Sequence, residues 1–141
     1  MKFVTYKVGS EERLGILDDA RGVLDVVKAG RAIVGRDLPG NMLSFIAAGD
    51  AALADARRLL EADSGWMPLA SLKLMAPIPH YKKNVFCVGR NYKLHIEEGA
   101  RARGVPVSFP PLPEFFSKPP TTVIGNGDDI QCDSRCTQQL D

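Results

Sequence analysis

The chain has 141 residues, of which 45% are hydrophobic and 25% are charged, and its formal net charge at pH 7 is +1. This balance is ordinary for a folded protein with one or two small domains. The near-neutral charge gives no electrostatic case for binding nucleic acid or an anionic membrane, and no run of about 20 apolar residues predicts a transmembrane helix. The first residues lack the apolar core of a signal peptide, so we expect a cytoplasmic protein.

The first thirty residues predict an antiparallel meander of three short strands. Apolar and polar side chains alternate over residues 1–7, as in a half-buried strand, and the apolar segments Arg13–Leu17 and Val23–Val27 follow. Polar turn residues separate them at Val8–Ser10 and Asp18–Gly22.

Two helices are expected next. Asn41 is a suitable N-cap for a short helix that ends at Gly49. Asp50 can cap a second helix over residues 51–62, for which we expect a packing role. The apolar residues that recur at helical spacing in this second helix are Leu53, Ala56, Leu59 and Leu60.

A stiff connector, Pro77–Pro79, interrupts the pattern and predicts a boundary between two domains. We therefore expect a small N-terminal α+β domain over residues 1–76 and the start of a second domain over residues 77–141. The proline-rich segment that follows contains several phenylalanines, which favours an ordered loop over a flexible one. Within it, Gly125–Asp129 predicts a tight turn.

The sequence offers no zinc site. His80 lies in a polar loop, and neither histidine of the chain has partners at zinc-ligand spacing. Cys132 and Cys136 form a CxxxC spacing that suits neither a zinc knuckle nor a redox CxxC motif. Together with Cys87, they are expected to be separate reduced thiols that serve as small apolar side chains.

The strongest chemical signal is a histidine and a glutamate that follow an apolar run. Asn84–Val88 predicts a buried strand, and Tyr92–Arg103 predicts a helix with Asn91 as its N-cap. His95 and Glu98 are then three positions apart and share one face of that helix. A carboxylate beside an imidazole orients it and favours its protonation, as a general base needs. From the spacing alone, a surface ion pair is the alternative.

Several segments resemble the fumarylacetoacetate hydrolase superfamily. They are KNVFCVGRNYKLHIEE (residues 83–98), PEFFSKPPTTVIGNGDDI (residues 113–130) and TQQLD at residues 137–141. The early segment VTYKVGSEERLGILDD resembles the small N-terminal β-rich domain of many bacterial members. The resemblance implies an α+β fold, in which this domain precedes the beginning of a mixed β-sheet and β-roll catalytic domain that is incomplete in this chain.

Members of this superfamily cleave or rearrange carbon–carbon bonds in β-diketo or acylpyruvate-type acids. The resemblance therefore implies a metal-dependent hydrolase of a small oxo acid, of the kind used in aromatic catabolism, with isomerase or 2-oxo acid decarboxylase chemistry as alternatives. By position, His95 and Glu98 resemble the dyad that activates water. Arg90 and Lys118 resemble residues that meet a substrate carboxylate, although a salt bridge at the strand end is an equal reading for Arg90.

The resemblance also implies a Mg²⁺ cofactor, with Mn²⁺ or Ca²⁺ as alternatives. Members carry the metal-binding Glu-x-Glu pair after the position of Asp141, so we expect no metal ligands within this chain and no activity from it alone. An inactive domain without the metal site is the corresponding alternative. Turn and solvation roles are expected for the carboxylates near the end of the chain, which are Asp128, Asp129, Asp133 and Asp141.

Two further expectations follow from the resemblance. Members are commonly homodimers that bind a small oxo acid, and neither nucleic acid nor a membrane is expected as a partner. Strands that belong to a larger sheet would also leave apolar surface uncovered. The residues expected to be exposed for this reason are Val85, Phe86, Val88, Phe115 and Phe116.

Overall fold

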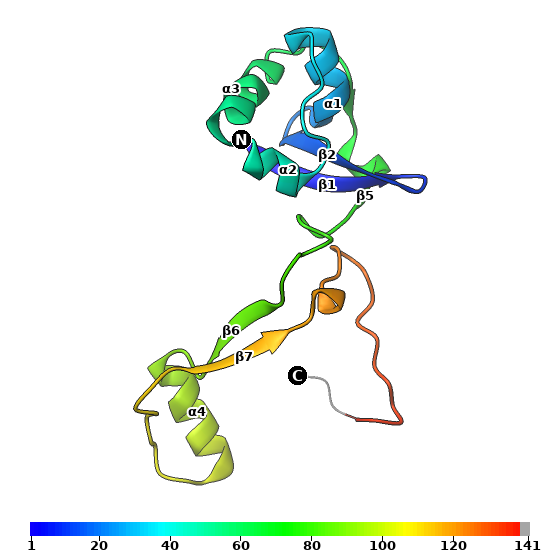
Figure 1. The fold of residues 1–141 in the computed structure, drawn as a ribbon. Coiled ribbons are helices and arrows are strands. Elements are labelled where there is room, and N and C mark those ends of the chain that lie inside the picture. Colours follow the sequence, from blue (N-terminus) through cyan, green and yellow to red (C-terminus); the bar gives the residue numbers. More distant parts are fainter. Residues whose placement is uncertain (139–141) are drawn as a thin grey trace. The chain divides into compact units, whose positions relative to one another are not determined.

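The computed structural model describes residues 1–138 and contains two compact units (Figure 1). The first unit comprises Met1–Pro79 together with the segment from Ile124 onward, and the second comprises His80–Val123. The predicted domain boundary between residues 76 and 77 stays a prediction for the complete fold. None of the helices described in residues 1–138 is long and apolar enough to cross a membrane.

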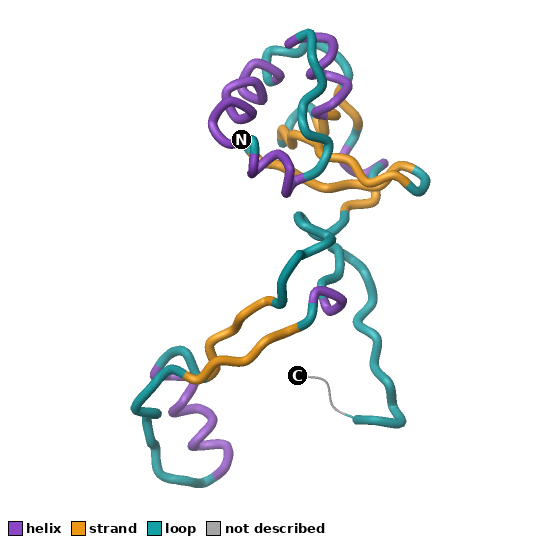
Figure 2. The backbone as a smooth tube through the Cα atoms, in the orientation of Figure 1, coloured by secondary structure: helices purple, strands orange, loops and turns teal. Residues whose placement is uncertain are grey.

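The first unit is built on an antiparallel sheet of five strands in the described residues, in the order β4-β3-β2-β1-β5. Figure 2 draws the strands in orange and the helices in purple. The bounds are β1 Lys2–Val8, β2 Glu11–Asp18, β3 Gly22–Asp25, β4 Trp66–Met67 and β5 Lys73–Leu74. The predicted meander is confirmed, with Phe3 opposite Ile16 and Ile16 opposite Leu24. The two-residue strands β4 and β5 were not expected. Gly22 permits the approach of β4, because a Cβ there would lie 2.1 Å from the carbonyl oxygen of Met67.

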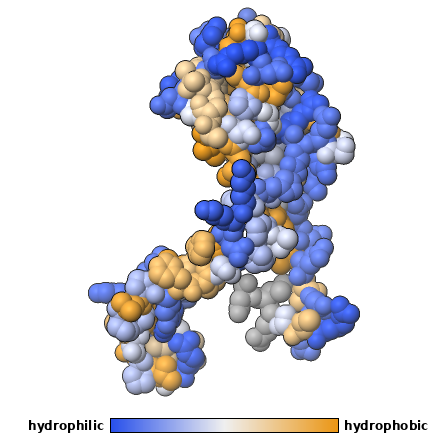
Figure 3. Space-filling model, viewed as in Figure 1, coloured by the Kyte–Doolittle hydropathy of each residue, from blue (hydrophilic) through white to orange (hydrophobic). Residues whose placement is uncertain are grey.

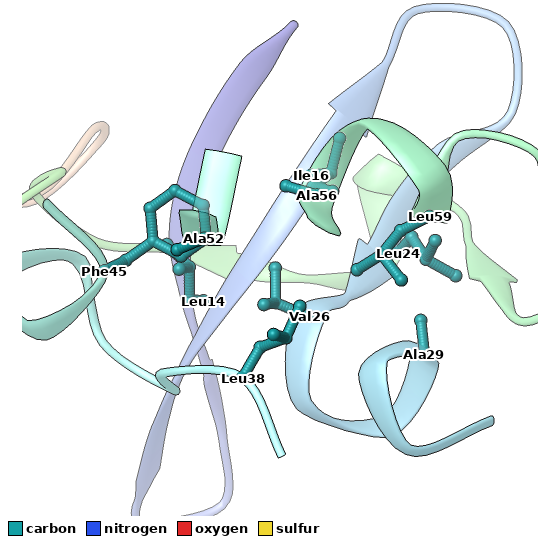
Figure 4. Close-up of a cluster of buried hydrophobic side chains, with 10 residues drawn as sticks. All are labelled: Leu14, Ile16, Leu24, Val26, Ala29, Leu38, Phe45, Ala52, Ala56 and Leu59. Carbon is teal, nitrogen blue, oxygen red and sulfur yellow. The ribbon is translucent and has the colours of Figure 1, made fainter. Parts of the chain in front are cut away.

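The helices of the first unit cover one face of this sheet and close its core (Figure 4). Their bounds are α1 Val26–Ala29, the π-helix η1 Gly30–Val34, α2 Met42–Ala47, α3 Gly49–Leu59 and the 3₁₀ turn η2 Leu69–Ser71. Leu14 and Ile16, two residues apart on β2, point to the same side and into the core. The other core residues are Leu24, Val26, Ala29, Leu38, Phe45, Ala52, Ala56 and Leu59.

The prediction of a strand over Val23–Val27 is wrong in its second half. Strand β3 ends at Asp25, whose carboxylate accepts a 2.9 Å hydrogen bond from the backbone N–H of Lys28 and so caps α1. Val26 is fully buried on the helix that follows. The cap and this burial outweigh the strand preference of consecutive valines. The helical turn and π-helix over residues 26–34 were therefore missed.

The next two helices were predicted with partly correct ends. Asn41 caps α2 as expected, because its side-chain oxygen accepts a 2.9 Å hydrogen bond from Ser44 N–H. Helix α3 begins one residue before Asp50, which lies in the first turn instead of capping it. An acidic residue is favourable both at the N-cap and in the first turn of a helix, so the sequence alone does not show which of these positions Asp50 occupies. The helix ends at Leu59, three residues earlier than predicted.

The turn at Gly125–Asp129 is confirmed in the first unit. The backbone N–H of Gly125 donates to Oδ2 of Asp128 at 2.9 Å, and Lys73 pairs with the same carboxylate at 3.2 Å. The three cysteines are free thiols, as expected. However, Cys132 and Cys136 are exposed, so they do not serve as packed apolar side chains.

The second unit contains a two-stranded ribbon and one long helix in the described residues. Its elements are β6 Val85–Gly89, α4 Lys93–Arg103, β7 Glu114–Lys118 and the 3₁₀ turn η3 Pro120–Thr122. Strands β6 and β7 are antiparallel, with Val85 opposite Lys118 and Gly89 opposite Glu114.

The predicted burial of β6 is wrong for this unit by itself. Phe86 is 75% exposed and Phe115 is 69% exposed, and hydrophobic surface lies along the ribbon (Figure 3). Val88 and Phe116 are exposed as well, whereas Val85 is half-buried. The expectation that these strands expose apolar surface is thus confirmed except at Val85. A ribbon of two strands has no second layer of its own to cover its faces.

Candidate functional site

The candidate site begins where strand β6 ends. Gly89 is the last residue of β6, and Arg90 follows with a φ of 46°. Arg90 is the single non-glycine residue with positive φ within residues 1–138. Such a conformation is unfavourable for a side chain with a Cβ, and residues of this kind gather at functional sites. The turn leads the chain from β6 into helix α4.

A bidentate ion pair fixes the side chain of Arg90. Its Nε donates to Oε2 of Glu114 at 2.8 Å, and its Nη2 donates to Oε1 at 2.5 Å. Glu114 stands opposite Gly89 in the ribbon, so the pair joins the two strands at their shared end. The hydrogen bonds from Arg90 lower the pKa of Glu114, which therefore stays ionised at neutral pH.

A hollow of about 340 Å³ opens beside this strand end. Arg90, Tyr92 and Lys93 supply its polar wall, and Ile96 of α4 supplies part of its apolar wall. The opposite wall is the segment Phe109–Pro113. Its three prolines restrict the backbone, which makes this wall stiff. The volume is at the lower end of the range for small-molecule sites.

Helix α4 carries the two residues expected to form a dyad. The helix begins after Tyr92, whose side chain makes no capping hydrogen bond, so the prediction of Asn91 as the N-cap is wrong. Ile96 and Ala100 form its buried face. His95 and Glu98 lie on the exposed face, one turn apart as the spacing predicted.

His95 contacts the candidate site through an aromatic ring. The ring centroids of His95 and Tyr92 are 5.4 Å apart, with an interplanar angle of 43°. Tyr92 lines the hollow, whereas His95 stands beside the lining. In the part of the chain that the structure describes, no hydrogen bond or ion pair joins His95 to Glu98. The assignment of these residues as a dyad stays a prediction, since catalytic contacts can tighten when substrate binds.

Lys118 lies at the other end of the ribbon. It stands opposite Val85, and Glu114 stands opposite Gly89. Lys118 lies four positions after Glu114 along β7, which is roughly 14 Å at about 3.4 Å per residue. The structure therefore groups Arg90, Tyr92 and His95 at one end and leaves Lys118 apart from them.

The described residues do not fit a divalent cation. No three histidine, cysteine, aspartate or glutamate side chains within residues 1–138 come together as a ligand set. Asp128 is engaged by Lys73, and Asp133 pairs with Arg135 at 2.8 Å. Asp141 lies outside the described residues. We therefore derive no step of the chemistry through a metal ion.

Two residues of this site were missed in the sequence. Glu114 was missed because the register of the strand around Phe115 against β6 was not predicted, so its place opposite Gly89 could not be inferred. Lys93 looked like an ordinary charge on a helix, although it lines the hollow. The polar wall thus carries two cationic side chains, Arg90 and Lys93.

The ribbon, the helix and the hollow beside them form the candidate site, and comparisons with known proteins agree on a family. The family described as Fumarylacetoacetate (FAA) hydrolase C-terminal matches residues 84–141. Oxaloacetate tautomerase YisK from Bacillus subtilis (strain 168) is 35% identical over 151 aligned positions, covering 100% of this chain and 48% of that protein. Human mitochondrial oxaloacetate tautomerase FAHD2A is 37% identical over 93 positions, covering 66% of this chain and 27% of that protein.

A solved structure supports the same fold. Fumarylacetoacetate hydrolase from psychrophilic Exiguobacterium antarcticum matches with a TM-score of 0.54 and 22% sequence identity, covering 99% of this chain and 43% of that one. The chain belongs to the fumarylacetoacetate hydrolase superfamily and corresponds to the N-terminal portion of such a protein. It spans about half the length of the Bacillus subtilis relative.

Proposed function

We propose that this chain supplies the substrate-binding strand end and the proton-transfer helix of an oxaloacetate tautomerase. The observation that carries the proposal is the 35% identity to the Bacillus subtilis oxaloacetate tautomerase along the whole chain. Tautomerisation is the isomerase alternative that the family resemblance left open. It replaces hydrolysis of a carbon–carbon bond as the favoured reaction.

The charge of the hollow supports this substrate class. Oxaloacetate carries two carboxylates, and Arg90 and Lys93 provide two cationic side chains on one wall. A planar guanidinium suits bidentate binding of a carboxylate, whereas an ammonium group acts as a compact point charge. The apolar wall around Ile96 and Phe109 would exclude water from the carbon that exchanges a proton.

His95 is the proposed proton carrier. Its imidazole takes a proton from C3 of keto-oxaloacetate, and the electron pair of that C–H bond forms the C2–C3 double bond while negative charge moves to the C2 oxygen. The imidazolium then returns the proton to this oxygen, which gives the enol and restores neutral His95. Tyr92 packs beside the ring and holds its orientation. Glu98 would stabilise the transient imidazolium from the next turn.

Carbon–carbon bond hydrolysis is the second candidate. The matching family and the structural neighbour from Exiguobacterium antarcticum both carry the name fumarylacetoacetate hydrolase. In that reaction His95 would take a proton from water, and Glu98 would orient the imidazole. The same residues serve both reactions, so product analysis is needed to separate them.

The test uses the full-length protein. Enol-oxaloacetate and acetylpyruvate are each supplied, and products are identified by proton NMR. The proposal predicts fast conversion of enol to keto oxaloacetate and little cleavage of acetylpyruvate. His95→Gln should abolish the conversion, whereas His80→Gln, the matched histidine variant in the polar loop, should retain it. Cleavage of acetylpyruvate without tautomerisation would contradict the proposal in favour of the second candidate.

We also propose that the full-length protein is a cytoplasmic homodimer that binds Mg²⁺ through residues outside the described part of this chain. The small oxo acid would be its ligand, with no nucleic acid or membrane as a partner. Mass determination of the full-length protein in solution by light scattering tests the dimer, and a monomeric mass would contradict it.

A further inference from the structure

Glu114 engages only one edge of the Arg90 guanidinium. The contact uses the N–H of Nε and one N–H of Nη2. A guanidinium has five N–H groups. Both N–H groups of Nη1 and the second one of Nη2 have no hydrogen-bond partner among residues 1–138. This second edge has the geometry to bind a planar carboxylate.

The pair differs from an ordinary surface ion pair in how its ends are anchored. Exposed pairs usually join two flexible side chains and contribute little. Here Glu114 stands opposite Gly89, and Gly89 immediately precedes Arg90. Arg90 also has its backbone in the left-handed region, which commits the residue to one direction at the end of β6. Both partners are therefore fixed by the strand end.

Arg90 and Glu114 differ in their relation to the hollow. Arg90 contributes to the lining of the hollow, together with Tyr92 and Lys93, and Glu114 does not. The carboxylate of Glu114 thus holds the arginine from outside the set of residues that line the hollow. Glu114 thus supports the side chain of Arg90, and Arg90 is the group available to bind a ligand.

We propose that Glu114 is a positioning residue that presents Arg90 to a carboxylate of the substrate. Glu114 does not touch the substrate and acts only through Arg90. The inference deepens the proposed function and rests on it for the identity of the substrate alone. The benefit is that Arg90 is ordered before the ligand arrives, so its side-chain entropy is not lost on binding.

Two opposing effects decide whether a substitution at Glu114 weakens or strengthens ligand binding. Removing its charge relieves repulsion of a ligand carboxylate across the guanidinium, which is worth about threefold in affinity at most in water and less with salt. Removing Glu114 also frees the arginine side chain. If the side chain then loses all of its rotamer freedom when the ligand binds, the affinity falls about thirtyfold. The second effect is larger, so the net expectation is about tenfold weaker binding.

The experiment measures the dissociation constant of malonate, a non-reacting dicarboxylate, by isothermal titration calorimetry on the full-length protein. The variants are Glu114→Ala, Arg90→Gln and their combination. Asp37→Ala is the matched control, because Asp37 holds the Nε and Nη2 edge of Arg31 in the same way at an exposed site of the first unit. Glu114→Gln, which keeps the shape of the side chain and an acceptor oxygen, replaces Glu114→Ala if that variant does not fold.

The expected result is about tenfold weaker malonate binding for Glu114→Ala, at least as much for Arg90→Gln, and no additional loss in the combination. Asp37→Ala should bind malonate like the wild type. Unchanged or tighter binding in Glu114→Ala, a full additive loss in the combination, or no binding by the wild type would overturn the inference. Because malonate is not turned over, binding with this pattern in a protein that lacks tautomerase activity would refute the proposed function and leave the inference standing.

Discussion

The hydroxyl of Tyr6 donates a 2.7 Å hydrogen bond to Oδ2 of Asp25, and both residues are buried in the first unit. The same carboxylate accepts hydrogen bonds from the guanidinium of Arg13 and the backbone N–H of Lys28. Asp25 therefore ends strand β3, caps helix α1 and joins β1 to both. The cluster lies outside the candidate site and explains why a charged residue is tolerated in this core.

Removing the hydroxyl should destabilise the first unit. Tyr6→Phe leaves the Asp25 carboxylate with one buried hydrogen bond fewer, which is expected to cost about 1–3 kcal/mol in the free energy of unfolding. Urea unfolding followed by fluorescence of Trp66, the single tryptophan of the chain, measures this cost. Tyr81→Phe is the matched control, because the Tyr81 hydroxyl makes no hydrogen bond within residues 1–138. Equal stability of Tyr6→Phe and the wild type would contradict the assigned role.

The stability of the first unit should decline in acid. Burial alone would raise the pKa of Asp25, but the hydrogen bonds from Lys28 N–H, Tyr6 and Arg13 outweigh it and leave the pKa below its ordinary value. A lowered folded-state pKa adds stability above the unfolded pKa of about 3.9, and this stability is lost as the pH falls through the folded-state pKa.

The variant Asp25→Asn should therefore show a shallower loss of stability between about pH 5 and the acid limit. Asp18 is the comparison, because hydrogen bonds from Arg21 lower its pKa to about 2 and it titrates in the same window. Asp18→Asn should also make the dependence of stability on pH shallower, independently of Asp25→Asn. Urea midpoints measured across this range test both variants, and an unchanged slope in Asp25→Asn would show that its carboxyl does not titrate with folding.

A buried residue of α3 and an exposed residue of α2 should differ in their contribution to stability. Leu59 is fully buried against the sheet, and Leu59→Ala should lower the free energy of unfolding by about 2–5 kcal/mol. Ile46 is 60% exposed on α2, so Ile46→Ala should change it by less than about 0.5 kcal/mol. Urea unfolding of both variants gives the comparison, and similar losses in the two would contradict the packing described.

The exposed face of the ribbon should make the 141-residue chain prone to association. Phe86 and Phe115 lie on the same face of β6 and β7, because Val88 stands opposite Phe115 and is two residues from Phe86 on β6. Replacing both phenylalanines by serine should reduce binding of a hydrophobic dye and light scattering. Phe109→Ser, at a half-exposed residue outside the strands, is the control. Equal dye binding by the double variant and the wild type would mean that this face is covered.

Local chemistry was predictable from the sequence, and contacts between distant residues were not. The cap at Asn41 follows from one side chain and the backbone three residues on, so it was found. At Val26 and Val27 the valine preference for strands concealed a helix whose burial is a tertiary fact, although its cap at Asp25 is as local as the cap at Asn41. The pairing of Arg90 with Glu114 spans 24 residues and requires knowing that β7 lies beside β6.

The candidate site shows the same division. The motif around Arg90 and the spacing of His95 and Glu98 indicated the family and one helical face, and both hold in the structure. The grouping with Tyr92 and the separation of Lys118 depend on the register of a ribbon that the sequence does not specify. The chain spans about half the length of the Bacillus subtilis relative, so the reaction remains a proposal that the sequence of this chain does not specify.

The most direct test of the account is the rate at which the full-length protein exchanges the C3 protons of oxaloacetate for deuterium, followed by NMR in D₂O. The account predicts catalysed exchange that falls by about 10²-fold or more in His95→Gln, as expected when a general base is removed. It also predicts weaker substrate binding with little change in maximal rate in Glu114→Gln. Exchange at the uncatalysed rate, or undiminished exchange in His95→Gln, would contradict the assignment of His95 as the proton carrier.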